Sequence, residues 1–323
     1  MERIAARVME IHSQDGRAPF RGRVLAVRGG ALGDFILTLP ALRALREAGF
    51  EVELLTRPAY GRLAMEAGIV SGWRSLDAPE VAALNLADAP VDPAVRAWLS
   101  GFDRVVSWLP DADGAFRQQV RRCGVHHFHQ GDWRCAGSGP ALEQLAAAVA
   151  FAGTVIAPVT DLFGGATLVN PIGKQLIALH PGSGSPRKNW PLERWLAVMT
   201  SLQSRDPDLA WLVVTGEAEA ERFPEIGEAL DRSGLPWHSA NGLDLTTLAS
   251  RLWDCRMLLG HDSGISHLAA ACGVPCRLLF GPTDPAVWAP PGENVRVLRA
   301  SLGNLSALTP PSVVDWLMDE LFQ

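Results

Sequence analysis

Three stretches of the sequence combine glycine with charged or hydroxyl side chains at a spacing typical of ligand-binding turns. The first, GGALGDFILTLP at residues 29–40, places Gly30, Gly33 and Asp34 between an apolar run and a helical pattern. Glycines in such a turn let the backbone approach a ligand, and the start of a helix favours negative charge. Asp34 is therefore either a helix-start residue or a carboxylate that acts on a substrate. GGxxGD is an incomplete GxGxxG fingerprint, and Glu53 is only loosely placed as a ribose acid, which weakens a nicotinamide-binding interpretation.

The second stretch, HPGSGSPRKNWPLERW at residues 180–195, follows an apolar run and precedes a helix that Pro191 helps to start. Small hydroxyl residues and cations gather at the ligand-facing end of the predicted strand, which suits a diphosphate. No GK[ST] follows at the spacing of a Walker loop, and a solvated basic loop is the alternative. The residues concerned are Ser183, Gly184, Ser185, Arg187 and Lys188.

The third stretch runs from residue 260 to 290 and begins GHDSGISHLAAACG. A strand is predicted to end near Asp262, and a helix to begin with Ser263 and Gly264. The first turn of that helix would offer unpaired amides to an anion, with His267 close by. Alternatively, Ser263 is only a helix cap and His267 a buried histidine.

Other charged groups of the N-terminal half have weaker patterns. The D-x-D in PDADG, residues 110–114, is typical of a divalent-metal site in some transferases, but a surface turn is favoured. A zinc site drawn from the nearby cysteines and histidines matches no standard spacing. The arginines of the same region suit an acceptor-side basic patch, with a solvated helix face as the alternative. The cysteines and histidines are Cys123, His126, His127, His129 and Cys135, and the arginines are Arg117, Arg121 and Arg122.

The elements that must position these residues alternate between strand and helix along both halves of the chain. Apolar runs that predict strands and 3.6-residue patterns that predict helices follow one another, as in parallel α/β sheets. Residues 153–174 lose helical periodicity and carry several Gly and Pro, which indicates a linker between two doubly wound units. The predicted strands are 23–29, 51–56, 72–77, 102–108, 176–182, 210–216, 257–262 and 277–281, and the predicted helices include 35–49, 92–100, 138–152, 192 onward, 245–256 and 263–273.

The composition sets limits on the class of protein. The chain has 323 residues, enough for two cores, and its net charge of −6 argues against nucleic acid as a partner. Its five cysteines are odd in number and scattered, which suits a reducing cytoplasm. No run is apolar and long enough to span a bilayer, and the opening MERIAARVMEIHSQDGR has no apolar signal core, so only peripheral contact with the inner membrane is expected.

Taken together, GGALGDFILTLPALRAL, HPGSGSPRKNWPLERW, TGEAEAER and GHDSGISHLAAACGVPCRLLFGPTDP resemble the landmark regions of glycosyltransferase family 9, which contains the ADP-heptose:lipopolysaccharide heptosyltransferases. The resemblance runs from about residue 23 to 290, with little to match between 70 and 170. It implies a GT-B fold, with two Rossmann-like doubly wound parallel-sheet domains facing a cleft. It also implies a cytoplasmic, inverting, metal-independent transferase without a cofactor, which moves a heptose or related sugar from an ADP-sugar to a lipid-linked or glycan acceptor.

The same resemblance implies roles for individual residues. Asp34 matches the general base, Lys188 the cation that faces the donor phosphates, and Asp262 the acid of the D-[ST]-G segment. Glu219 matches a glutamate that contacts the ribose, although Glu217 and Glu221 leave that register open. Donor phosphates would contact Ser183, Gly184, Ser185, Ser263, Gly264 and His267. From the residues alone, and not from the resemblance, we expect the acceptor near Gly30, Gly33, Arg117, Arg121 and Arg122.

We therefore expect an acceptor-binding domain over residues 1–165 and a nucleotide-sugar-binding domain over 166–305. A C-terminal helix over 306–323 is amphipathic and could pack back on the N-terminal domain. Its apolar face is predicted to comprise Val313, Val314, Trp316, Leu317 and Leu321. Two alternatives from other classes remain at this point: a nicotinamide-dependent oxidoreductase, and a non-catalytic protein that binds sugar nucleotides.

Overall fold

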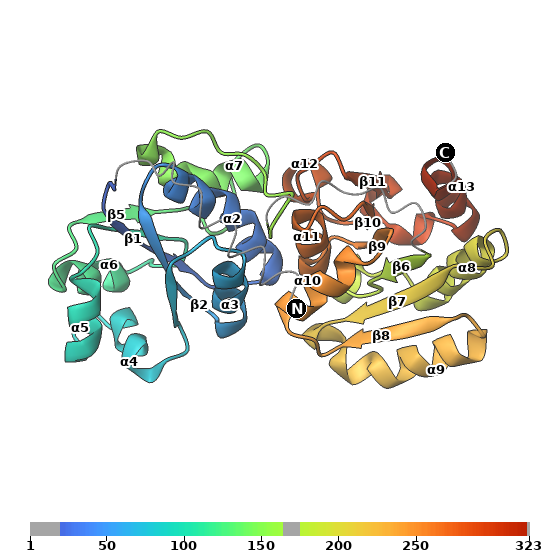
Figure 1. The fold of residues 1–323 in the computed structure, drawn as a ribbon, viewed down its shortest axis with the longest axis horizontal. Coiled ribbons are helices and arrows are strands. Elements are labelled where there is room, and N and C mark those ends of the chain that lie inside the picture. Colours follow the sequence, from blue (N-terminus) through green and yellow to red (C-terminus); the bar gives the residue numbers. More distant parts are fainter. Residues whose placement is uncertain (1–19, 164–174, 322–323) are drawn as a thin grey trace. The chain divides into compact units, whose positions relative to one another are not determined.

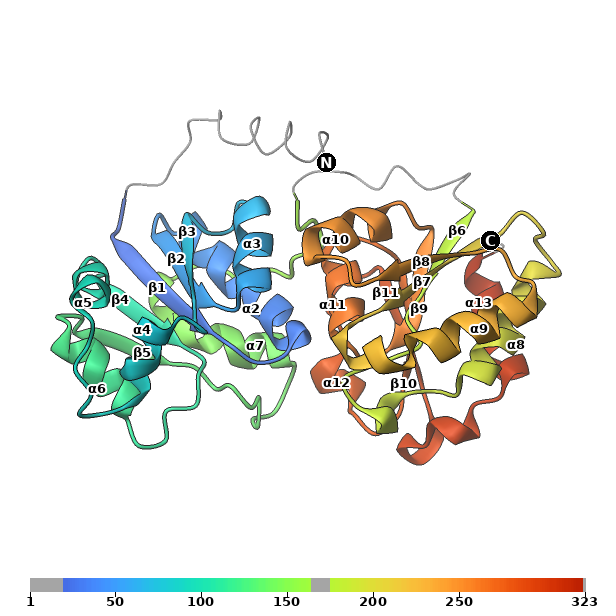
Figure 2. The same cartoon turned by 90° about the horizontal axis from the view of Figure 1, so that it is seen from below.

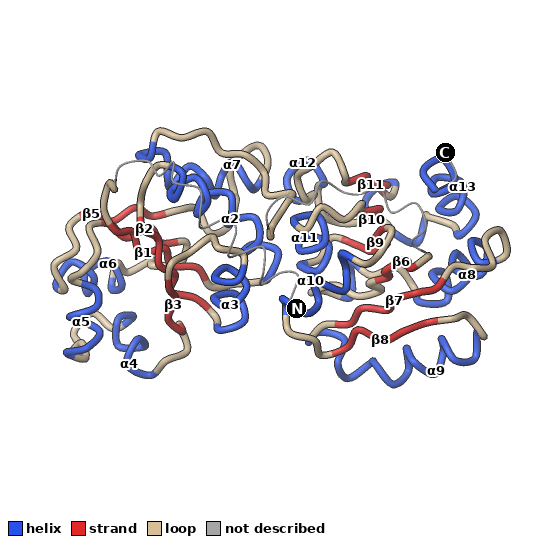
Figure 3. The backbone as a smooth tube through the Cα atoms, in the orientation of Figure 1, coloured by secondary structure: helices blue, strands red, loops and turns tan. Residues whose placement is uncertain are grey.

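A computed structural model of the chain describes residues 20–163 and 175–321. The polar leader and residues 164–174 of the predicted linker lie outside the described residues. The chain divides into two compact units between Val159 and Thr160 (Figure 1). Each unit is a parallel sheet with its own helices, as the tube colouring of Figure 3 shows.

The first unit contains five parallel strands in the order β3-β2-β1-β4-β5. The strand at the centre, β1, is buried because its sequence RVLAVR is apolar over consecutive positions, as a strand covered on both faces requires. The strands are β1 (Arg23–Arg28), β2 (Glu51–Thr56), β3 (Gly72–Ser75), β4 (Arg104–Ser107) and β5 (His127–Gln130). The α-helices are α2 (Leu32–Glu47), α3 (Pro58–Glu66), α4 (Pro79–Ala82), α5 (Pro93–Leu99), α6 (Ala115–Arg122) and α7 (Ala141–Ala146).

The second unit contains six strands in the order β11-β10-β9-β6-β7-β8, again parallel. Chain order reverses direction on the two sides of β6, and this is the switch point at which doubly wound sheets bind ligands. The strands are β6 (Leu176–Leu179), β7 (Ala210–Thr215), β8 (Trp237–Asn241), β9 (Met257–His261), β10 (Cys276–Phe280) and β11 (Val295–Arg299). The α-helices are α8 (Leu192–Gln203), α9 (Phe223–Ser233), α10 (Leu245–Trp253), α11 (Gly264–Ala271), α12 (Pro285–Trp288) and α13 (Pro310–Leu321).

The C-terminal helix α13 belongs to the core of the second unit. Val313, Val314 and Leu317 are buried in the same apolar cluster as Trp195 and Val198 of α8. Both views show α13 beside α8, and the two helices are in contact (Figures 1 and 2). The predicted apolar face is thus used within the C-terminal unit, while the side chain of Leu321 lies outside the described residues.

Each predicted strand is present, within a few residues at its ends. Three further strands, β5, β8 and β11, were not predicted. Their sequences HFHQ, WHSAN and VRVLR mix polar and apolar residues, and β5, β8 and β11 each form an edge of a sheet, where one side is open to solvent. No helix in the described part of the chain is long and apolar enough to cross a membrane.

Candidate active site

The carboxyl edge of the second sheet brings together residues that are far apart in the sequence. Strands β6 and β9 are parallel neighbours, so the loops that follow them meet. Lys188 Nζ lies 3.1 Å from Asp262 Oδ2, an ion pair whose partners are 74 residues apart. The Lys188 side chain is 24% exposed and that of Asp262 only 10%, so the cation is the outer member of the pair.

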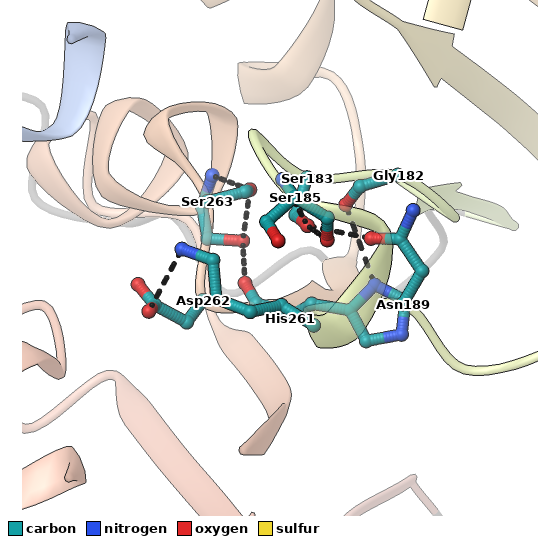
Figure 4. Close-up of polar contacts among 9 residues, drawn as sticks. Gly182, Ser183, Ser185, Asn189, His261, Asp262 and Ser263 are labelled. Atoms are coloured by element: carbon teal, nitrogen blue, oxygen red, sulfur yellow. Dashed lines mark hydrogen bonds and ion pairs between the residues drawn. The ribbon is translucent and has the colours of Figure 1, made fainter. Parts of the chain in front are cut away.

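The loop after β6 is held in a compact turn by its own side chains (Figure 4). Ser183 Oγ lies 2.7 Å from the carbonyl oxygen of Ser185 and 2.5 Å from Asn189 Oδ1. It also accepts a hydrogen bond from the amide of Ser185 at 3.2 Å. Gly184 is exposed, and a side chain there would meet no other atom within 4 Å. The hydroxyl of Ser183 therefore shapes the turn, and the outer face of the loop stays open.

Helix α11 begins beside this loop, directly after Asp262. Ser263 is its N-cap, because its hydroxyl accepts a hydrogen bond from the amide of Ser266 at 3.2 Å. The hydroxyl of Ser266 donates in turn to the carbonyl of His261 at 2.6 Å. The capping interpretation of Ser263 thus holds, and the amide of Gly264 is among the first-turn groups that no intrahelical acceptor can pair. Positive potential from these amides adds to that of Lys188.

His267 is buried in α11 and its Nδ1 has no hydrogen-bond partner among the described residues. Burial lowers the pKa of this ring to about 4, with a smaller opposing effect from Asp262 and a further lowering by Lys188. The imidazole is therefore neutral at pH 7. A neutral ring with a free nitrogen is an acceptor that a bound ligand or water can use.

Glu219 is the buried member of the three candidate glutamates, whereas Glu217 and Glu221 are exposed. Its Oε2 accepts a hydrogen bond from the amide of Gly216 at 2.9 Å. The carboxylate also lies against Gly182, where a Cβ would overlap it. Gly182 is therefore glycine because Glu219 approaches its backbone. Of the three candidate glutamates, Glu219 is thus the one that lies against the loop after β6.

The carboxyl edge of the first sheet holds Asp34 in the first turn of α2. Its Oδ1 lies 3.8 Å from Nη2 of Arg28, the last residue of β1. Arg28 is buried, and its Nη1 donates to the carbonyl of Trp108 at 3.3 Å, whereas Nε and Nη2 have no hydrogen-bond partner among the described residues. Burial lowers the pKa of Arg28, and the charge of Asp34 opposes that shift. The sequence analysis missed Arg28, although a charge that ends an apolar strand is a signal that could have found it.

The glycine turn beside Asp34 is built from Gly30 and Gly33. Gly30 has φ +85°, a left-handed conformation that favours glycine, and its carbonyl accepts a hydrogen bond from the hydroxyl of Tyr60 at 3.2 Å. The Tyr60 ring stacks on Phe35 at 4.6 Å. Gly33 lies in the first turn of α2, next to Asp34. The side chain of Tyr60 on α3 therefore stabilises the turn. Asp34 remains 29% exposed.

The arginines proposed for the acceptor side lie on α6, and the structure does not bring all of them to this edge. Arg117 is in the first turn of α6, with its guanidinium 5.1 Å from the centre of the Phe128 ring. Arg121 and Arg122 are in the last turn, and Arg96 of α5 donates to the carbonyl of Arg122 at 2.9 Å. A helix that connects parallel strands runs back toward their amino ends, so Arg121 and Arg122 lie at the opposite edge from Asp34.

The two metal interpretations gain no support from local contacts. Asp111 and Asp113 cap α6: Asp111 Oδ1 accepts from the amide of Phe116 at 3.0 Å and Asp113 Oδ1 from that of Ala115 at 3.2 Å. Cys123 lies in the apolar cluster of the first unit, and burial raises the pKa of its thiol. The described residues contain no group of three His, Cys, Asp or Glu side chains placed to hold a metal ion.

Comparison with known proteins defines the class. The solved structure of a family 9 glycosyltransferase from Veillonella parvula superposes with a TM-score of 0.72, 18% identity and coverage of 93% of this chain and 97% of that one. The E. coli heptosyltransferase WaaC with ADP superposes at 0.70, with 21% identity and coverage of 92% and 99%. The two doubly wound units thus have the GT-B fold, which confirms the predicted fold class.

The sequence matches then identify the family. Residues 142–314 match glycosyltransferase family 9 (heptosyltransferase), and the chain belongs to this family. Lipopolysaccharide heptosyltransferase 1 of Pseudomonas aeruginosa is 29% identical over 298 residues, covering 81% of this chain and 79% of the relative. The predicted family and the assignment as a glycosyltransferase are confirmed, and the oxidoreductase and non-catalytic alternatives are set aside.

Proposed function

We propose that this enzyme transfers heptose, with inversion and without a metal ion, from ADP-heptose to a lipopolysaccharide inner-core acceptor. The observation that carries the proposal is the Lys188–Asp262 pair, which presents an outward cation beside the first turn of α11. A leaving diphosphate needs this kind of positive surface. The names of the relatives support heptose as the sugar, and the WaaC structure with ADP supports adenine as the base.

In the proposed reaction, Asp34 accepts the proton of the acceptor hydroxyl. The acceptor oxygen forms a bond to the anomeric carbon as the bond from that carbon to the β-phosphate oxygen breaks. The electron pair of the broken bond leaves with ADP, whose negative charge Lys188 and the α11 amides stabilise. A single displacement of this kind inverts the anomeric centre. Because the proposed acceptor is lipid-linked, the enzyme would act at the inner face of the cytoplasmic membrane.

The test is transfer itself. Purified protein is incubated with ADP-heptose and a heptose-free lipopolysaccharide acceptor, and the product is weighed by mass spectrometry and its anomeric configuration read by NMR. We expect one heptose added with inverted configuration and an equal amount of ADP released. GDP-heptose and UDP-glucose serve as matched donors. Transfer from either of these but not from ADP-heptose, or retention of configuration, would contradict the proposal.

A further inference from the structure

The buried ring of His261, the last residue of β9, joins the two ends of the loop that carries Lys188. Its Nε2 accepts a hydrogen bond from the amide of Trp190 at 2.9 Å and lies 3.3 Å from the indole Nε1 of Trp195. Its Nδ1 lies 3.3 Å from the carbonyl oxygen of Gly182. Gly182 begins the loop and Trp190 ends it, so one side chain is in contact with both. Figure 4 shows the contact between His261 and Gly182.

These contacts require one tautomer of the ring. Nε2 faces two N–H donors and so carries no proton, which leaves Nδ1–H to donate to the carbonyl of Gly182. Burial lowers the pKa of His261 to about 3, and the nearby His180 and Lys188 lower it further, against the effect of the Gly182 carbonyl. The ring is thus neutral, and both of its nitrogens are used in hydrogen bonds within the protein, Nε2 as an acceptor and Nδ1 as a donor.

His261 also connects the loop to the other part of the site. Its backbone carbonyl accepts from the hydroxyl of Ser266 in the first turn of α11, and the next residue along the chain is Asp262, the partner of Lys188. The Trp195 ring packs edge-on against the imidazole, with centroids 5.5 Å apart. The ring therefore sits where strand β9, the Lys188 loop and helix α11 meet.

We propose that His261 is a positioning residue that holds the Lys188 loop in its nucleotide-binding conformation before the nucleotide arrives. The inference rests on the proposed function for the identity of the ligand, ADP or an ADP-sugar. Without the ring, the Trp190 amide and the Gly182 carbonyl lose buried partners, and the loop between them is no longer closed. Binding would then have to order the loop, and affinity would fall.

The experiment compares substitutions that differ in which bond they keep. His261→Leu removes both nitrogens, whereas His261→Gln keeps an amide oxygen close to the position of Nε2. The matched control is Asn294→Leu: Asn294 Nδ2 donates to the carbonyls of Ala270 and Val274 at 3.2 and 2.9 Å, at the opposite end of α11. The readouts are ADP affinity by calorimetry, amide hydrogen exchange at Trp190 without ligand, and thermal melting.

We expect His261→Leu to raise the Kd for ADP by about 10- to 100-fold and to speed exchange at Trp190, since the buried amide of Trp190 would lose its acceptor. His261→Gln should show a smaller change in both and, because it keeps the Trp190 bond, it decides the question if the Leu variant does not fold. Asn294→Leu should lower the melting temperature but leave ADP affinity unchanged.

Two results overturn the positioning role. One is wild-type exchange and ADP affinity in a folded His261 variant, and the other is an equal loss of affinity in Asn294→Leu, which would show that the effect is only one of stability. A wild-type protein that binds no ADP would instead overturn the proposed function. The exchange rate at Trp190 would then still decide whether the ring holds the loop.

Discussion

The two sheets end in sites of opposite charge arrangement. At the edge of the first sheet the cation is inside: the Arg28 side chain is 3% exposed and Asp34, 3.8 Å away, is 29% exposed. At the edge of the second sheet the carboxylate is inside: Asp262 is 10% exposed and Lys188, 3.1 Å away, is 24% exposed. One Rossmann-like plan thus presents a carboxylate to solvent in one unit and an ammonium in the other.

The two charge arrangements differ because the acid and the cation come from different segments in the two units. In the first unit the strand ends in Arg28 and the following helix supplies Asp34. In the second unit the acid comes directly after β9, and the cation comes from the loop after the neighbouring strand β6. An outward carboxylate suits proton removal and an outward ammonium suits a leaving diphosphate, which are the roles proposed above for Asp34 and Lys188.

The largest effect is expected at the outward carboxylate. Asp34→Asn keeps the shape of the side chain in the first turn of α2 but cannot accept a proton, so we expect kcat to fall by roughly 10²- to 10⁴-fold. ADP affinity and melting temperature should stay near those of the wild type. Turnover close to the wild-type value in the folded variant would show that Asp34 serves only the start of α2.

At the second edge, Lys188→Ala removes the outward ammonium. We expect ADP binding to weaken by about 1–3 kcal/mol, the usual range for a charge-assisted hydrogen bond to phosphate. Calorimetry measures the change, and Arg232→Ala on α9 is the charge-matched control because Arg232 is 71% exposed. Unchanged ADP affinity in Lys188→Ala would remove Lys188 from the site.

The buried cation of the first edge is tested by Arg28→Met, which fills a similar volume without charge. Two donors of Arg28, Nε and Nη2, make no hydrogen bond in the described part of the chain, so replacing Arg28 should leave the free energy of unfolding unchanged or raise it by about 1 kcal/mol. Turnover should fall roughly fivefold, since the ion pair that orients Asp34 is worth about 1 kcal/mol. A large loss of stability with normal turnover would mean that Arg28 serves the fold alone.

The second edge should also make stability depend on pH. His261 and His267 have pKa values lowered to about 3 and about 4 in the fold, below the roughly 6.5 of an unfolded histidine. Their neutral forms stabilise the fold fully above about pH 6.5, and this contribution is lost as pH falls toward the folded values, by about 1.4 kcal/mol per pH unit for each ring.

Urea unfolding between pH 7.5 and 4.5 measures this dependence. His261→Gln should reduce the slope of unfolding free energy against pH by the contribution of one ring. His238→Gln replaces an exposed ring and should leave that slope unchanged. An identical slope in the wild type and His261→Gln would contradict the assignment of a buried neutral imidazole.

The smallest effect is expected from metal removal. Because Lys188 and the first amides of α11 supply positive charge at the proposed diphosphate position, EDTA should leave turnover unchanged. Steady-state rates with and without the chelator measure this. Activity that disappears with EDTA and returns with Mg²⁺ or Mn²⁺ would direct attention back to Asp111 and Asp113.

The sequence by itself determined the central strands and the class of fold. Strands such as β1, β7 and β9 are mainly runs of apolar residues because both faces are covered, and this pattern can be recognised within a short stretch of sequence. The glycine turn at Gly30 and the N-cap at Ser263 are likewise local, since a left-handed φ and an N-cap depend on neighbouring residues.

Only the tertiary structure decided which charges meet and which side chains support them. Lys188 meets Asp262, and Trp190 meets His261, across more than seventy residues, because β6 and β9 are neighbours in the sheet. The burial of Arg28 likewise depends on β4, whose following residue Trp108 supplies its acceptor. Strand order is a property of the whole packed sheet, and no short stretch of sequence contains it, which is why residue types could be predicted for this site and their partners could not.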